Sequence, residues 1–163
     1  MPELTHIDHE GRVRMVDVTD KDASDRTAIA RGTISMNAAT FEKIQTHTAA
    51  KGNVLETARI AGIMAAKRTS ELIPMCHPLS ITHIQVDFFP DKIENSIKIE
   101  ATVRIKGRTG VEMEALTAVS VAALTVYDMC KSYDRTMTIS DICLLEKSGG
   151  KSGVFKRNDH HKS

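Results

Sequence analysis

A cysteine and a histidine stand side by side between two prolines in residues 71–79, and this segment has the residue types best suited to chemistry. Pro74 and Pro78 fix their own φ angles and disfavour helix in the residues that precede them. We therefore expect Cys76 and His77 on a stiff, extended or turning segment that ends the apolar helical stretch before it. Rigid loops beside regular elements commonly carry binding and catalytic groups. A helix-to-strand connection with a buried cysteine would show the same pattern.

Lysines recur at positions where they could hold phosphates. Lys51 precedes a predicted helix start, where free backbone N–H groups favour anions, and Lys67 lies near the end of that helix. Lysine is a point donor for phosphate, and a buried lysine can also act as an acid or a base. A solvated surface lysine is the alternative for each position.

Two further lysines, Lys147 and Lys151, flank a pair of glycines in the run Lys-Ser-Gly-Gly-Lys-Ser at 147–152. The run partly matches a nucleotide phosphate loop, but position 145 is leucine rather than glycine and no predicted helix follows. We expect a mobile loop that grips phosphate, with a disordered tail as the alternative.

Asp128 and Lys131 lie three residues apart near the end of a predicted helix over 111–131, so their side chains are neighbours on its surface. An exposed ion pair would need no further explanation. Asp128, however, stands in an otherwise apolar stretch, where a carboxylate has to be paired, neutral or part of a site.

Two acids, Glu112 and Glu114, open the same helix, where the helix dipole favours negative charge. Glu114 and Asp128 are 14 residues apart, which is about 21 Å along a regular helix. Two groups at that distance cannot touch one reacting atom. They serve either opposite ends of a long substrate or a site that combines one helix end from each of two chains, and we favour the second interpretation.

A metal site is not predicted. No Cys-x-x-Cys or His-x-x-x-His spacing occurs, and adjacent side chains point in different directions from an extended segment. The candidate ligands are Cys76, His77, His83, Cys130 and Cys143, and the pair His160 and His161 is expected to belong to a disordered tail.

Apolar periodicity and turn residues predict an α+β fold, with helices mixed among antiparallel strands and no regular βαβ alternation. Strands are predicted at 13–18, 28–36, 81–89, 96–105 and 136–145, with the third and fourth in a hairpin broken at Pro90. Helices are predicted up to 45 after a cap at Asn37, over 53–68 after a capping box of Asn53 and Glu56, and over 111–131. We expect one domain over 1–163 with mobile ends at 1–11 and 155–163.

Composition argues against several classes of function. The 163-residue chain has a net charge of +1, which disfavours nonspecific nucleic-acid binding, and few aromatic side chains to stack on bases. Its first residues lack the basic start and apolar run of a signal peptide, and the apolar segment 115–127 is shorter than the about 20 residues that span a bilayer. Three cysteines, an odd number, indicate free thiols in a reducing cytoplasm.

The predicted helix 112–130 has apolar residues on nearly every face. A helix of this kind has to be buried all round, and one sheet covers only one side of it. We therefore expect a partner subunit to cover the rest.

Four sequence blocks occur in an order known from one family. They lie at 15–18, from Lys51 through 61–63 to 77–79, at 109–116 and at 144–153. On these blocks the chain resembles the molybdenum cofactor biosynthesis protein C family, the cyclic pyranopterin monophosphate synthases, over roughly residues 12–154. The resemblance implies a ferredoxin-like fold with helices on one face of an antiparallel sheet. It also implies a homohexamer, a trimer of dimers, with sites at subunit interfaces.

The reaction of that family converts 3′,8-cyclo-7,8-dihydroguanosine 5′-triphosphate to cyclic pyranopterin monophosphate and releases pyrophosphate. The resemblance implies that Asp128 is catalytic and that Lys51 and Lys131 are acid–base lysines. The substrate-binding residues that it implies are Met75, Cys76, His77, Met113, Glu114, Glu112, Lys67, Lys147 and Lys151. No resident metal or cofactor is implied, and whether Mg²⁺ accompanies the phosphates stays open.

Two non-enzymatic functions fit parts of the same pattern. One is an oligomeric nucleotide-binding regulatory module of ferredoxin-like shape, which would bind guanine nucleotide without turnover. The other is a metal-dependent protein that uses Cys76 and His77, which would lose its function to chelators.

Overall fold

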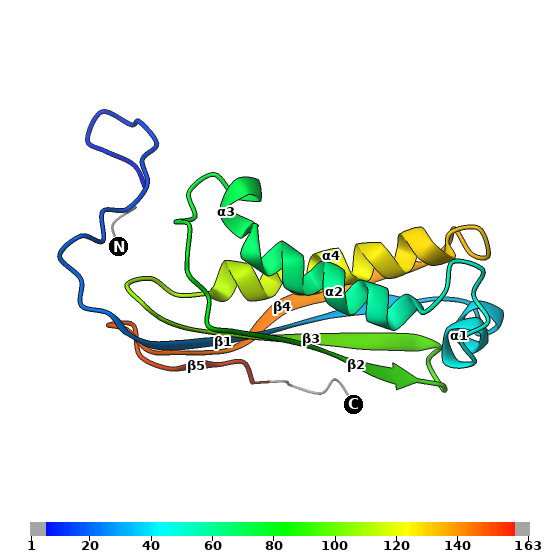
Figure 1. The fold of residues 1–163 in the computed structure, drawn as a ribbon. Helices are drawn as coiled ribbons and strands as arrows, with labels where there is room; N and C mark the ends of the chain where they lie inside the picture. Colours follow the sequence, from blue (N-terminus) through cyan, green and yellow to red (C-terminus); the bar gives the residue numbers. More distant parts are fainter. Residues whose placement is uncertain (1–5, 159–163) are drawn as a thin grey trace.

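An antiparallel sheet of five strands with helices packed on one face forms the body of the molecule in the computed structural model, which describes residues 6–158 (Figure 1). The strands are β1 (Ser24–Ser35), β2 (His83–Asp91), β3 (Ser96–Gly107), β4 (Thr138–Ser148) and β5 (Phe155–Lys156), and the helices are α1 (Ala38–Gln45), α2 (Val54–Lys67), α3 (Thr69–Leu72) and α4 (Glu112–Cys130). The strand order is β2-β3-β1-β4-β5. The succession β1-α2-β2-β3-α4-β4 on this order is the ferredoxin-like arrangement, so the predicted α+β fold is confirmed.

Small and β-branched residues at alternating positions of the central strands form the core. Along β1, Ala28, Ala30 and Ile34 are fully buried beneath the helices. The register places Ile34 opposite Ile97 and Ala28 opposite Val103 of β3, and both partners are also fully buried. The intervening positions of β1 are mostly half-buried, as expected for a sheet with one open face.

Strand β4 departs from regular pairing near its end. Leu144 pairs with Ala30 of β1. Lys147, three residues further on, pairs with Ala28, which is only two residues from Ala30. The extra residue is a β-bulge at Leu145, and it turns Lys147 to the same face of the sheet as Leu144.

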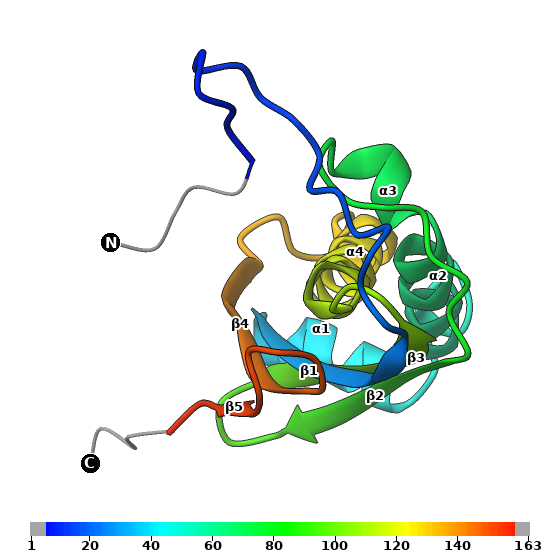
Figure 2. The ribbon, with the colours of Figure 1, turned by 90° about the vertical axis from the view of Figure 1, so that its left-hand side faces the viewer.

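Helix α4 lies over the sheet with α2 beside it (Figures 1 and 2). Small residues let the two helices approach closely, because Ala118 and Ala122 are fully buried and a Cβ on Gly62 of α2 would lie 3.0 Å from the carbonyl oxygen of Ala118. The helices run antiparallel, so Lys51, just before α2, reaches Asp128 near the end of α4.

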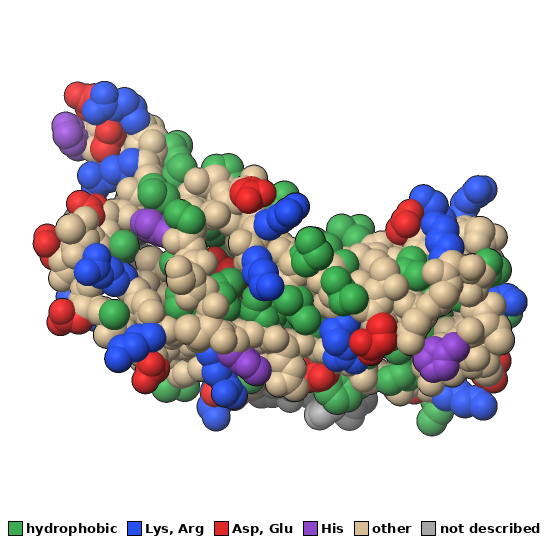
Figure 3. Space-filling view, viewed as in Figure 1, with side chains coloured by type: hydrophobic (Ala, Val, Ile, Leu, Met, Phe, Trp, Pro, Cys, Tyr) green, Lys and Arg blue, Asp and Glu red, His purple; other side chains and the backbone are tan. Residues whose placement is uncertain are grey.

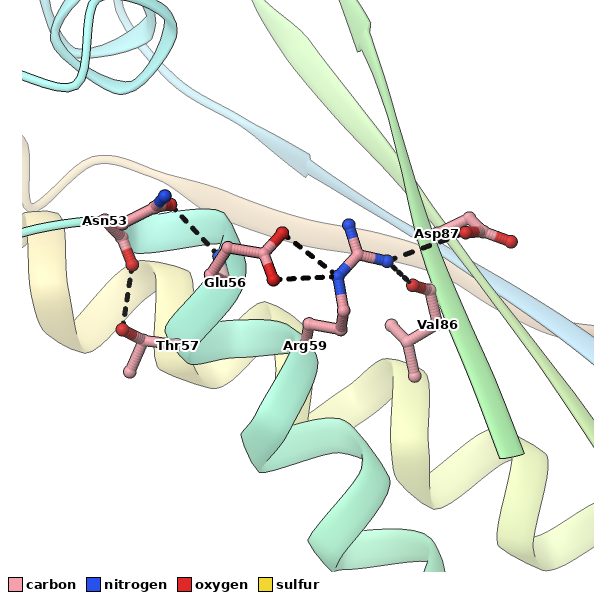
Figure 4. Close-up of polar contacts among 6 residues, drawn as sticks. All are labelled: Asn53, Glu56, Thr57, Arg59, Val86 and Asp87. Carbon is pink, nitrogen blue, oxygen red and sulfur yellow. Dashed lines mark hydrogen bonds and ion pairs between the residues drawn. The ribbon is translucent and has the colours of Figure 1, made fainter. Parts of the chain in front are cut away.

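An arginine links α2 to the edge strand β2 (Figure 4). The guanidinium of Arg59 donates to the carbonyl oxygen of Val86 and lies 3.6 Å from the carboxylate of Asp87. It also lies 3.1 Å from the Glu56 carboxylate. Asn53 caps the helix by accepting a hydrogen bond from the backbone N–H of Glu56. The predicted cap at Asn53 is confirmed, and the Glu56 side chain turns to Arg59.

Part of the helical layer is uncovered in a single chain. By length and composition α4 resembles a membrane-crossing helix, but 56% of its most apolar 18-residue stretch is buried inside the molecule. Leu124 is 57% exposed, and Ile60 and Met64 of α2 are 59% and 46% exposed. The burial expected on all sides of α4 is therefore incomplete within one chain.

Several predicted strand boundaries in the first two-thirds of the chain are wrong, including those of β2, which spans 83–91 rather than 81–89, and the end of β3, which lies at 107 rather than 105. Residues 14–18 form no strand, and Val13 makes an isolated bridge with Ile7. Strand β1 begins at 24 rather than 28, because its polar start still pairs with β3. Pro90 does not break the hairpin, since it lies opposite Ile97 on an edge strand, where a missing donor can face solvent.

The last third also differs from the prediction. Strand β4 begins at Thr138 rather than 136 and continues to Ser148 rather than ending at 145, and β5 follows within the predicted tail because it pairs with Glu146 and Lys147. In the middle of the chain a short helix, α3, includes residues 71 and 72, whereas Cys76 and His77 follow it on a turn and irregular chain, as the prediction of an extended or turning segment allows. Residues 1–5 and 159–163, which include His160 and His161, lie outside the described residues.

Replacing Gly62 by Ala should lower the free energy of unfolding. A glycine-to-alanine change inside a helix ordinarily stabilises by about 1 kcal/mol. Here the new Cβ would lie 3.0 Å from the Ala118 carbonyl oxygen and 3.3 Å from the Ala122 Cβ, so α2 would be pushed away from α4. Urea unfolding followed by circular dichroism measures the change. A more stable variant would show that the two helices separate without loss.

Candidate active site

A cavity of about 320 Å³ lies at the N-terminal end of α4. Its walls are the 75–79 segment, the first turn of α4 with the loop before it, and the N-terminal segment from Val16 to Lys21, together with side chains from β1 and β4. Seven of the nine predicted substrate-binding residues line it: Met75, Cys76, His77, Glu112, Met113, Glu114 and Lys147.

The 71–79 segment reaches the cavity through a helical turn followed by irregular chain. The backbone N–H of Cys76 donates to the carbonyl oxygen of Ile73 at 3.1 Å, which closes a turn after α3. Beyond it, the Nε2 of His77 is 2.7 Å from the carbonyl oxygen of Val16. Because a carbonyl oxygen only accepts, Nε2 carries the hydrogen. The bond orients the imidazole and ties the N-terminal segment to the cavity wall.

Glu114 is a buried acid in this cavity, with 4% of the residue exposed. Burial raises the pKa of its carboxyl to about 7, and the charge of Glu112 adds to the shift. Burial, together with the charge of Glu114, also raises the pKa of the Cys76 thiol. Near neutral pH Glu114 can therefore donate or accept a proton, whereas Cys76 stays a neutral thiol and is not activated as a nucleophile.

Cationic side chains surround these acids. The Nζ of Lys147 lies 3.3 Å from the Glu112 carboxylate. Arg26 of β1 lines the same cavity and donates to the carbonyl oxygen of Arg108 at 3.1 Å. Four cationic residues and two acidic residues line the cavity: Lys21, Arg26, Arg108 and Lys147, with Glu112 and Glu114. The excess of positive charge suits a polyanionic ligand.

The loop after β4 passes close to the start of β1 because it contains two glycines. Gly149 and Gly150 have φ angles of 93° and 77°, and a Cβ on either would overlap the first residues of β1. The loop brings the hydroxyl of Ser152 to a hydrogen bond with Lys147. It places Lys151 beside a neighbouring cavity of about 610 Å³.

A second cluster forms at the C-terminal end of α4. The Nζ of Lys131 donates to the Asp128 carboxylate at 2.7 Å, and the Nζ of Lys51 lies 3.5 Å from the same carboxylate. Lys51 also donates to the Asp128 carbonyl oxygen at 3.1 Å. The hydrogen bond from Lys131 and the charges of both lysines hold the pKa of Asp128 below its ordinary value. The carboxylate is therefore ionised at neutral pH, and all three side chains are more than half exposed.

The predicted catalytic and substrate-binding groups thus lie at opposite ends of one helix. Continuous helix separates Glu114 from Asp128, over a length of about 21 Å. A single chain does not bring the two clusters together. Lys67 joins neither, because it is exposed in the last turn of α2 and does not line the cavity. Lys151 lines the neighbouring cavity and not the cavity at the start of α4.

Sequence reasoning missed three cations of the cavity: Lys21, Arg26 and Arg108. Arg26 precedes the predicted start of its strand, and the other two lie in loops. For two of them the sequence position is a signal that could have indicated the site, since Lys21 follows the sequence block at 15–18 and Arg108 adjoins the block at 109–116.

The candidate metal ligands do not gather. Within residues 6–158, no group of three or more His, Cys, Asp or Glu side chains is arranged to hold a metal ion. Cys130 is buried in the core, Cys143 is half-buried in β4, and His83 begins β2.

Comparison with known proteins identifies the family. The model of the MoaC family matches residues 15–150. The chain belongs to the MoaC family. The match includes both ends of α4 and every predicted site residue except Lys151. The resemblance predicted from the sequence blocks is confirmed.

MoaC-family relatives match nearly the whole chain. A protein named cyclic pyranopterin monophosphate synthase from Desulforapulum autotrophicum is 66% identical over 155 residues, which cover 95% of each chain. A protein of the same name from Desulfitobacterium hafniense is 60% identical over 163 residues, covering 99% of this chain and 98% of the relative. Another from Heliobacterium modesticaldum is 55% identical over 159 residues, covering 98% of this chain and all of the relative.

The Glu114→Gln variant should lack a pH-dependent loss of stability that the parent shows. The pKa of this carboxyl is about 7 in the fold against an ordinary 4.5, so the folded chain holds the proton more tightly than the unfolded chain. The resulting stabilisation is complete below the unfolded pKa and is lost as pH rises through the folded pKa. Relative to the variant, the parent should lose about 2–3 kcal/mol of unfolding free energy from pH 4.5 to 8. Urea unfolding of both proteins across this range measures the difference, and a constant difference would contradict the prediction.

Proposed function

We propose that this chain is a cyclic pyranopterin monophosphate synthase of molybdenum cofactor biosynthesis. Its substrate is 3′,8-cyclo-7,8-dihydroguanosine 5′-triphosphate, and its products are cyclic pyranopterin monophosphate and pyrophosphate. The name carried by relatives at 55–66% identity supports the proposal. The cationic cavity and the cluster at Asp128 also support it, because both have an excess of positive charge that suits a phosphorylated substrate.

The observation that carries the proposal is the pair of lysines on one carboxylate. Asp128 faces Lys131 at 2.7 Å and Lys51 at 3.5 Å. One negative charge opposes two positive charges, so the cluster keeps an excess positive charge and attracts phosphate. In the proposal the two lysines are the acid–base groups, and the ionised Asp128 orients them.

Pyrophosphate release fits these groups. Forming a cyclic phosphate requires an internal oxygen of the substrate to attack the α-phosphorus while the bond to the diphosphate breaks. The attacking hydroxyl gives up a proton and the departing diphosphate gains negative charge. In the proposal Lys51 and Lys131 share these two tasks, the transfer of the proton and the stabilisation of the leaving group.

The cavity beside Glu114 takes the heterocycle and the phosphates nearest to it. Met75 and Met113 offer adaptable apolar surface to a ring system. Glu114 is poised to donate or accept a hydrogen bond at the polar edge of the ring. Lys147 and Arg26 lie in the same wall for the phosphates.

One substrate meets both clusters when two chains share a site. Glu114 and Asp128 are equally far from Val121, since 114 and 128 average 121. Two copies that pack with antiparallel α4 helices about a two-fold axis near Val121 place Glu114 of one chain beside Asp128 of the other. Each dimer of this kind has two equivalent sites.

Exposed apolar side chains on the helical layer support such packing. Ile60 and Met64 on α2 and Leu124 on α4 are each at least 46% exposed, and Figure 3 shows hydrophobic side chains gathered over α2. A second copy of the chain would remove this surface from water. Three such dimers form the homohexamer that we propose, and the free cysteines suit a cytoplasmic location.

Turnover of the cyclised triphosphate tests the proposed function. Pyrophosphate and the cyclic phosphate product are measured together, because both come from one bond exchange at the α-phosphorus. A protein that binds guanine nucleotide and forms neither product would be a regulatory module, and the proposal would be wrong.

Replacing Lys51 or Lys131 by Ala should lower kcat by about 100-fold or more, because each removes an acid–base group. The fold should persist, since both side chains are exposed. Steady-state kinetics and circular dichroism measure the two effects. Near-parental turnover in both variants would rule out the proposed roles.

Mixing two inactive variants should restore activity if sites form between chains. An Asp128→Asn chain still supplies Glu114, and a Glu114→Gln chain still supplies Asp128, so a mixed dimer has one intact site and one doubly altered site. Random exchange of equal amounts gives mixed dimers in half of all pairs, and therefore about a quarter of parental activity.

Native mass spectrometry confirms that subunits have exchanged, and light scattering measures the size of each parent assembly. If exchange is complete and activity stays absent, each site is built within one chain. A folded and active monomer would contradict both the shared site and the hexamer.

A further inference from the structure

We infer that Tyr133 is a positioning residue that sets the place of Lys51 beside Asp128. Its phenolic oxygen accepts a hydrogen bond of 2.7 Å from the backbone N–H of Ala50, the residue directly before Lys51. The inference rests on the proposed role of Lys51 and extends it to a side chain outside the Lys51–Asp128–Lys131 cluster.

The loop that carries Lys51 has backbone hydrogen bonds of its own, from the N–H of Thr48 to Lys43 and from the N–H of Gly52 to Ala49, whereas the N–H of Ala50 is bound from outside the loop. It joins α1 to α2, and it contains two residues with positive φ, His47 at 56° and Gly52 at 95°. Ala49 is buried, but Ala50 and Lys51 are exposed. A lysine has many rotamers, so its ammonium meets a given carboxylate reproducibly only when the backbone beneath it is fixed. The hydrogen bond from Ala50 to Tyr133 supplies such a fixed point.

Tyr133 itself stands on a well-anchored turn. The backbone N–H groups of Tyr133 and Asp134 both donate to the carbonyl oxygen of Cys130, at 2.9 and 3.2 Å. The buried carboxylate of Asp134 accepts from the backbone N–H of Asn37 at 2.8 Å and from the N–H and hydroxyl of Thr136. The turn is thereby tied both to the end of α4 and to the start of α1.

The same turn carries Lys131, two residues before Tyr133. The hydrogen bond to Ala50 therefore joins the backbone segments of the two lysines that face Asp128. Without it, the Lys51 loop could drift relative to Lys131, although each lysine would still be present. A loss of this kind lowers the fraction of time in which both ammonium groups are aligned, and it lowers kcat more than substrate affinity.

The ring of Tyr133 has separate anchors, so the hydroxyl can be removed alone. The Nζ of Lys43 lies 5.0 Å from the ring centroid, and the ring packs against the core. A phenylalanine keeps both contacts. The Tyr133→Phe variant therefore deletes the acceptor for Ala50 and little else.

Tyr133→Phe should lower kcat about 3- to 10-fold, the effect of one neutral hydrogen bond, with KM changed less than about 2-fold. In a Lys51→Ala background the same change should cause no further loss, because the residue acts through Lys51. Tyr127→Phe is the matched control. Its hydroxyl donates to the carbonyl oxygen of Arg135 at 3.0 Å and does not contact the Lys51 loop, so this variant should keep the parental kcat.

The outcomes separate this inference from the function on which it rests. If Lys51→Ala keeps near-parental turnover, the proposed role of Lys51 fails and the inference fails with it. If Lys51→Ala is impaired while Tyr133→Phe matches the Tyr127→Phe control, the inference alone is overturned. Losses that multiply in the double variant would show that Tyr133 acts by another route. Thermal unfolding of each variant checks that the fold is retained.

Discussion

Close packing of α4 against the sheet and α2 is the constraint on which the rest of the structure depends. The contact uses some of the smallest side chains available, with Ala118 and Ala122 fully buried and Gly62 facing them from α2. A helix held this tightly cannot shift without opening the core. Its two ends are therefore fixed points at a constant separation, and the groups suited to chemistry are attached to one end or the other.

The two ends hold carboxylates in opposite states for opposite reasons. At the start of α4, burial raises the pKa of Glu114 to about 7, so this acid can hold a proton near neutral pH. At the other end, hydrogen bonding and charge from Lys131, with the charge of Lys51, lower the pKa of Asp128, so that carboxylate stays charged. Pairs of acids driven apart in this way are typical of sites that move protons. A site formed by both ends would combine a proton carrier with a fixed charge.

Sequence patterns correctly predicted the features that depend on interactions between residues close in the sequence. The helix over 111–131, the cap at Asn53 and the pairing of Asp128 with Lys131 all depend on residues within four positions of each other, and the structure has all three. The cavity was harder to predict, because strand pairing with β3 and side-chain hydrogen bonds to residues some 80 positions away place Arg26 there. The alternating apolar residues at 13–18 were assigned to a strand, but Val16 and Val18 line the cavity instead. Alternating apolar residues indicate that their side chains are buried, but they do not indicate which part of the structure buries them.

Because β4 has a bulge at Leu145, the ion pair between Lys147 and Glu112 helps to select the register in which β4 pairs with β1. If β4 ran straight on from Leu144, Glu146 would lie opposite Ala28, on the face where Lys147 now stands. An acid would then meet the Glu112 carboxylate, and the lysine would turn to the open face. The regular register would thus reverse the charge at one wall of the cavity, and repulsion between Glu146 and Glu112 would oppose it. The attraction at 3.3 Å between Lys147 and Glu112 favours the irregular strand, so the electrostatics of the cavity help to determine how the backbone pairs.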